Sequence, residues 1–118
     1  MAPRSQLEIA TASVQRLIKE EASYRRELEQ QKGRIQKLEA QDPSEDENRE
    51  YLLRQERLAL EETERIFPTL KQKIEETIAK LSSLLVEEGK KGAESNVEQI
   101  NAAKDAIAKA RTAEREIA

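Results

Sequence analysis

The stretch SQLEIATASVQRLIKEEASYRRELEQQKGRIQKLEA, residues 5–40, decides the fold of this chain. Positions that alternate in steps of three and four carry Leu7, Ala10, Val14, Leu17, Glu21, Tyr24, Leu28, Gln31, Ile35 and Leu38. All of them except Glu21 and Gln31 can face an apolar partner, and a repeat of 3.5 residues is typical of helices that pack lengthwise. We therefore expect one helix over residues 5–40. Glu21 and Gln31 either lie at the bundle edge or set the register of the packing.

Two further helices follow from the same spacing. Residues 44–88 carry Leu53, Leu60, Phe67, Leu70, Ile74, Leu81 and Leu84, and this stripe is widened by Leu52, Ile66, Ile78 and Leu85. Residues 95–117 carry Val97, Ile100, Ala103, Ile107, Ala110 and Ile117. Three Ser-x-x-Glu capping boxes predict where the helices begin, and they pair Ser5 with Glu8, Ser44 with Glu47 and Ser95 with Glu98.

Pro68 interrupts the second segment. A proline inside a helix loses one backbone hydrogen bond and clashes with the preceding turn, at a cost of about 3 kcal/mol. The apolar repeat nevertheless continues from Phe67 to Leu70 and Ile74, so we expect one helix kinked near residue 68. The predicted fold is all-α: residues 1–118 form a single domain, a three-helix antiparallel bundle with spectrin-like coiled-coil packing.

The composition argues against an enzyme. The 118 residues include no His and no Cys, and Gly33, Gly89 and Gly92 are scattered. Zinc sites built on His or Cys, Cys–His nucleophiles and glycine-rich phosphate loops are therefore excluded. Adjacent acids such as Glu20 and Glu21 would need a cleft to shift their pKa values. The acidic stretch at residues 42–47 lacks the ligand spacing of a calcium loop. We expect no catalytic residues, no cofactor and no metal.

The charge pattern narrows the partners. Lys and Arg number 21 against 24 Asp and Glu, which gives a net charge of −3, and the two signs are interleaved along the chain. A nucleic-acid partner calls for a basic stripe, usually with aromatic residues, and only 3% of the residues are aromatic. We therefore expect no nucleic-acid partner. No apolar run is longer than three residues, so we expect no membrane partner and a cytoplasmic location. Pairs such as Glu21→Arg25 and Glu61→Arg65 are expected to support the helix surfaces.

A family resemblance appears at this point. Residues 13–21, SVQRLIKEE, are followed by Tyr24 and Glu27, then by residues 30–32 and 35–38, and finally by Ile66-Phe67-Pro68 in the second helix. In this order the landmarks resemble the tubulin-folding cofactor A family, also called tubulin-specific chaperone A. The resemblance covers about residues 9–86, and the third helix matches only in its general character.

The resemblance implies a function. Members of that family are small cytoplasmic three-helix proteins that capture β-tubulin after its release from the cytosolic chaperonin and hold it before heterodimer assembly. They bind through helical surfaces, without nucleotide, metal or catalysis. The expectation is a β-tubulin-binding chaperone, monomeric or homodimeric, associated with the cytoskeleton. The predicted partner-binding residues are Arg16, Lys19, Glu20, Arg25, Arg26 and Glu27, because Arg16, Lys19, Glu20 and Glu27 match the family pattern and tubulin is acidic.

Two alternatives remain open at the level of the sequence. The six charged residues also fit an ordinary solvated helix face, since most exposed charges contribute little. The chain also fits a coiled-coil adaptor or scaffold that forms homo- or hetero-oligomers, in which the apolar stripes face another chain. Sedimentation would reveal such an oligomer, although a dimer could still bind tubulin.

Overall fold

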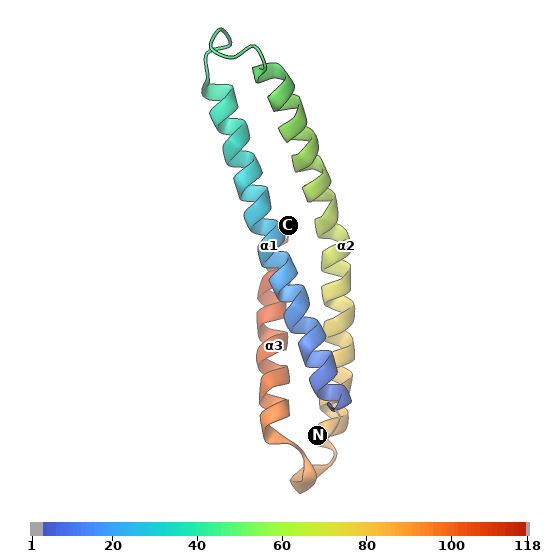
Figure 1. Cartoon of the computed structure of the whole chain (residues 1–118). Coiled ribbons are helices and arrows are strands. Elements are labelled where there is room, and N and C mark those ends of the chain that lie inside the picture. Colours follow the sequence, from blue (N-terminus) through green and yellow to red (C-terminus); the bar gives the residue numbers. More distant parts are fainter. Residues whose placement is uncertain (1–3, 118) are drawn as a thin grey trace.

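The computed structural model describes residues 4–117, which form three long helices. They are α1 (Gln6–Ala40), α2 (Arg49–Gly89) and α3 (Val97–Glu116), and a short 3₁₀ helix η1 (Gly92–Glu94) lies between α2 and α3. Figure 1 shows α1 and α2 as a long antiparallel hairpin, with α3 running back beside the N-terminal half of α1. The molecule is a rod of 73 × 29 × 17 Å. The prediction of an all-α three-helix bundle is confirmed.

The first predicted capping box is confirmed. The Ser5 hydroxyl accepts a hydrogen bond from the Glu8 amide at 3.1 Å, and the Glu8 carboxylate accepts one from the Ser5 amide at 3.3 Å. Two amides at the start of α1 that no helical carbonyl could reach are therefore satisfied.

The second predicted capping box is wrong. Both the amide and the hydroxyl of Ser44 donate to Asp42 Oδ1, at 3.0 and 2.8 Å. These two bonds close a local turn and lower the pKa of Asp42. Helix α2 consequently begins at Arg49, after Asn48, rather than at residue 44.

The third predicted capping box is also wrong, by one residue. Asn96 caps α3 and accepts a hydrogen bond from the Gln99 amide at 3.0 Å, whereas the Ser95 hydroxyl donates to the Gly92 carbonyl at 2.6 Å. Asn and Ser are equally good caps, so a sequence that offers both in succession does not say which is used.

The main core lies where all three helices meet. Its largest fully buried apolar side chains are Val14 of α1 and Ile74 and Leu81 of α2. Helix α3 contributes small residues instead, since Ala103, Ala106 and Ala110 are at most 1% exposed. Alanines on this face let α3 approach the other two helices closely. The buried cluster comprises Leu7, Ala10, Val14, Leu17, Leu70, Ile74, Ile78, Leu81, Ala103, Ala106, Ala110, Ile107 and Ile117.

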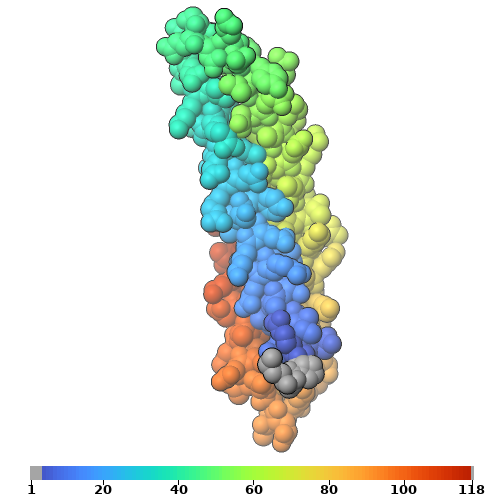
Figure 2. Space-filling model, viewed as in Figure 1, coloured from blue at the N-terminus to red at the C-terminus, as the bar shows by residue number. Residues whose placement is uncertain are grey.

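The other end of the rod is made by α1 and α2 alone (Figures 1 and 2). We call residues 33–63 the arm. Ile35 and Leu53 are buried there, and Arg34 Nε donates to Glu56 across the two helices at 3.1 Å. At the tip, Arg49 Nε donates to the Leu38 carbonyl at 2.8 Å, which satisfies one of the free carbonyls at the end of α1.

A contact between two helices buries less surface than a contact among three. Two residues that were predicted in the apolar stripes are exposed because of where they lie along the rod. Leu52 was expected to widen the buried stripe, but it is 39% exposed because α3 does not reach the arm. Val97 was expected in the stripe of the third helix, but it is 64% exposed at the first residue of α3.

The polar residues of the α1 stripe are buried rather than at an edge. Glu21 is 1% exposed and Gln31 is 4% exposed. Within residues 4–117, Gln31 Oε1 accepts no hydrogen bond. The α1 stripe therefore carries two polar groups into the contact with its neighbours.

Helix α2 continues through Pro68 from Arg49 to Gly89, as one helix rather than two. Pro68 is exposed, so its ring displaces no core side chain. The kink at this residue stays a prediction. No helix within residues 4–117 combines the length and the apolar character needed to cross a bilayer.

Glu88 stabilises the turn between α2 and α3 through two hydrogen bonds to its carboxylate. Its side chain is 9% exposed, one carboxylate oxygen accepts from the Asn96 amide at 3.1 Å, and the other accepts from Lys91 Nζ at 3.1 Å. The bond from the Asn96 amide and the bond from Lys91 lower the pKa of Glu88 below its ordinary value of 4.5. The backbone can turn here because Gly92 takes a φ of 61°.

We predict that Glu88→Gln destabilises the bundle in a pH-dependent way. A carboxyl whose pKa is lowered on folding contributes stability that is complete above its ordinary pKa, here 4.5, and that is lost as the pH falls through the folded-state pKa. The urea midpoint of Glu88→Gln should therefore lie below that of the wild type at pH 7, and the difference should shrink below pH 4.5. Glu87→Gln, at an exposed neighbour, should show neither effect. A difference that does not depend on pH would contradict this role.

Candidate functional site

The hollows on the surface lie along the lines where the helices meet. The part of the chain described here brings together no group of three acidic side chains able to hold a metal ion. A candidate site must therefore be sought on the faces and grooves of the helices.

Five of the six predicted contact residues share one face of α1. Arg16, Lys19, Glu20, Arg26 and Glu27 are all exposed. Arg16 precedes Lys19 by three residues and Glu20 by four. Lys19 in turn precedes Arg26 by seven residues, and Glu20 precedes Glu27 by seven. Residues at these spacings lie on the same side of an α-helix. These five predicted residues therefore lie on one charged face of α1.

Arg25 is different, because its guanidinium is held by a buried carboxylate. Both carboxylate oxygens of Glu21 accept hydrogen bonds from Arg25, one of them from Nε at 2.8 Å. The Arg25 side chain is 44% exposed while that of Glu21 is 1% exposed. The hydrogen bond to Glu21 raises the pKa of Arg25. Arg25 therefore compensates the one buried charge of the α1 stripe, which restricts its availability to a partner.

A groove runs between α1 and α2, and neither of its two adjoining hollows has an α3 residue in its lining. The hollows measure about 540 and 320 Å³, and both are lined by Glu20 and Lys73. We call this feature the α1–α2 groove. Its exposed rim carries Arg16 and Glu20 from α1 and Arg65, Lys73 and Glu76 from α2. Buried or half-buried Leu17, Tyr24, Ile66 and Leu70 form its floor.

The groove separates the predicted residues into groups. Arg16 and Glu20 line it, whereas Lys19 lines a different hollow, between α1 and α3, beside the ion pair of Asp105 and Lys109. Arg26 and Glu27 are exposed farther along the same face of α1.

Sequence reasoning missed the α2 side of the groove. Arg65 and Lys73 are eight residues apart on α2, a spacing that puts them on one side of the helix. Their helical pattern was visible in the sequence, but the register of α2 against α1 was not. The expected Glu61→Arg65 pair is also absent from the ion pairs among residues 4–117, and Arg65 lines the groove.

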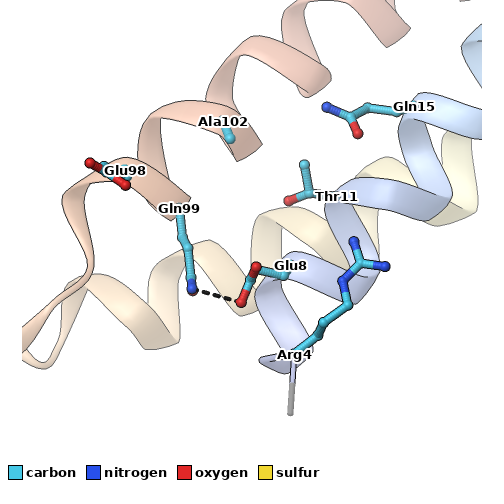
Figure 3. A pocket seen from close by; sticks show the side chains of 7 residues that line it. All are labelled: Arg4, Glu8, Thr11, Gln15, Glu98, Gln99 and Ala102. Atoms are coloured by element: carbon cyan, nitrogen blue, oxygen red, sulfur yellow. Dashed lines mark hydrogen bonds between the residues drawn. The ribbon is translucent and has the colours of Figure 1, made fainter. Parts of the chain in front are cut away.

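A smaller hollow of about 230 Å³ lies between the starts of α1 and α3 (Figure 3). Gln99 Nε2 donates to Glu8 at 2.8 Å, and the Ser5 hydroxyl donates to Gln99 Oε1 at 2.9 Å. These bonds join the first turn of α1 to the first turn of α3, so the side chains of Ser5, Glu8 and Gln99 serve the fold.

An all-α rod whose charged residues line grooves between helices belongs to the class of helical binding proteins. Comparison with known families gives the class a name. The family model described as tubulin binding cofactor A matches residues 2–107, and the chain belongs to this family. The tubulin-specific chaperone A of Saccharomyces cerevisiae is 41% identical over 76 residues, which cover 64% of this chain and 67% of that protein. No solved structure matches.

The comparisons confirm the resemblance read from residues 9–86. They also confirm that this is a family of chaperones and not of enzymes.

We predict that Arg25→Ala destabilises the fold. Removing the guanidinium leaves the Glu21 carboxylate buried without its partner, at a cost of about 1–3 kcal/mol in the free energy of unfolding. Arg26→Ala, one residue farther on and exposed, should change that free energy by less than about 0.5 kcal/mol. Urea unfolding measures both.

The double variant Glu21→Met with Arg25→Ala provides a control. Replacing both members of a buried pair with apolar groups is often neutral, so it should recover most of the loss. Equal stability of Arg25→Ala and Arg26→Ala would show that the pair does not stabilise the bundle.

Proposed function

We propose that this protein is a tubulin chaperone that captures β-tubulin monomers released from the chaperonin and holds them until heterodimer assembly. The observation that carries the proposal is membership of the tubulin binding cofactor A family over residues 2–107. The name of the yeast relative, tubulin-specific chaperone A, supports it. In this proposal the protein acts in the cytoplasm, beside the cytoskeleton, as a monomer or a homodimer.

The proposed mechanism is stoichiometric binding, in which no covalent bond is made or broken. The rod offers long helix faces with charges of both signs, and α1 alone spans 35 residues, or about 52 Å at 1.5 Å per residue. Such a face can cover a wide area of a folded monomer and shield its assembly surface. The proposed contacts are Arg16, Lys19, Glu20, Arg26 and Glu27, with the exposed side of Arg25.

The decisive experiment is capture from a chaperonin-released pool that contains labelled α- and β-tubulin. The immobilised protein should retain β-tubulin and leave α-tubulin in solution. Urea-unfolded protein on the same support controls for capture that does not depend on the fold. Equal retention of both tubulins, or of neither, would overturn the proposal.

We predict that reversing two charges of α1, Arg16→Glu with Lys19→Glu, weakens β-tubulin capture. Both side chains are exposed, so helical circular dichroism and the melting temperature should stay unchanged while the retained fraction falls. Lys104→Glu with Arg111→Glu, on an exposed side of α3, is the matched control and should capture normally. A drop in melting temperature for the α1 variant would show instead that these residues support the fold.

A further inference from the structure

We propose that the α1–α2 groove receives an acidic helix of the client, and that Arg65 and Lys73 of α2 bind its carboxylates together with Arg16 of α1. The inference rests on the proposed chaperone function. It goes further by naming the surface, the α2 residues and the chemistry of the bound segment.

The cations of the groove are available to a partner. Within residues 4–117, no ion pair or side-chain hydrogen bond engages Arg16, Arg65 or Lys73, whereas Arg25, Arg34, Arg49 and Arg57 all have acidic partners. Three unpaired cations thus face two carboxylates on the rim, those of Glu20 and Glu76, and Glu76 accepts a bond from Gln72 at 3.2 Å. The groove is net positive on a chain whose net charge is −3.

A hollow where α1 and α2 meet the end of α3 has the opposite charge. It measures about 450 Å³ and lies beside Phe67, Pro68 and Ile117. Its charged lining residues are Glu21, Arg25, Glu29, Lys32, Glu64 and Glu116. The two cations are paired within the hollow, Arg25 with Glu21 and Lys32 with Glu29, so Glu64 and Glu116 leave a negative surface. An acidic segment is therefore attracted to the α1–α2 groove and repelled from this second hollow.

The groove is long enough to hold three turns of a helix. It extends from Ser13 to Tyr24 along α1 and from Arg65 to Thr77 along α2, which is about 17 Å or three helical turns. The half-buried Tyr24 and Ile66 offer apolar contact at the floor. On another side of the same hairpin, α3 shows that a helix packs between α1 and α2.

The spacing of the cations predicts the sequence pattern of the bound helix. Arg65 and Lys73 are separated by about 12 Å along α2. A helix that meets both cations carries carboxylates about seven residues apart on one face, with apolar residues beside them. Coulombic attraction between exposed groups decreases with salt, so capture should weaken as ionic strength rises.

The first experiment is charge reversal on α2, Arg65→Glu with Lys73→Glu, measured by β-tubulin capture. We expect about tenfold weaker capture with an unchanged urea midpoint. Lys104→Glu with Arg111→Glu on α3 should capture as the wild type does. Arg65→Gln with Lys73→Gln removes the attraction without adding acids to α2, and it should also weaken capture. This variant provides the test if the reversal variant proves unstable.

The second experiment cross-links the protein to its captured client. A zero-length carbodiimide reagent couples an amine to a carboxylate in contact with it, so Lys73 should become linked to an Asp or Glu of the captured client. Lys73→Arg keeps the charge and removes the amine, so the yield of this link per amount of captured client should fall to background. The linked client peptide should carry further carboxylates three, four or seven residues away.

The outcomes separate this inference from the function on which it rests. If the wild type retains no β-tubulin, the chaperone proposal fails and the groove inference fails with it. If the wild type captures β-tubulin and both α2 variants capture equally well, the chaperone proposal stands and the groove inference is wrong. A link from Lys73 to an isolated carboxylate in a neutral or basic segment would also overturn it.

Discussion

The difference in length between the helices organises the rest of the structure. Helices α1 and α2 have 35 and 41 residues, whereas α3 has 20. Only the part of the hairpin that α3 reaches has a core closed by three helices, and the arm depends on the single contact between α1 and α2. Burial in the three-helix part supplies most of the hydrophobic stabilisation, since it holds nearly all of the fully buried apolar side chains.

The elements of this fold were predictable because each helix carries its own apolar stripe. The stripe of α1 predicted Val14 and Leu17 as core residues, and both are buried. The helix starts were harder, because competing local hydrogen bonds decide them. Asp42 engages Ser44 in a turn, and Asn96 takes the capping role expected of Ser95. The exposure of Leu52 depends on where α3 ends relative to α2, which no local pattern encodes.

The candidate site was predictable only on one helix. Spacing along α1 placed Arg16 and Glu20 on an exposed face, and the structure puts them on the rim of a groove. Arg65 and Lys73 face them from α2, but this depends on the register between two helices that meet over many residues. Arg25 shows the opposite limit. Its charge resembled those of its neighbours in the sequence, and only the burial of Glu21 reveals that the half-exposed guanidinium is held by a buried carboxylate.

The side-chain oxygen of Gln31, which accepts no hydrogen bond within residues 4–117, bears on where the two helices can separate. A buried acceptor without a donor carries a desolvation cost of about 1–3 kcal/mol, and this one lies on α1 two residues before the start of the arm. Separation of α1 from α2 near the arm would hydrate that oxygen and recover part of the cost, whereas separation near Leu81 would expose only apolar surface. Local separation of the helices is therefore expected to cost less at the two-helix end of the rod than in the three-helix part, which holds the apolar core.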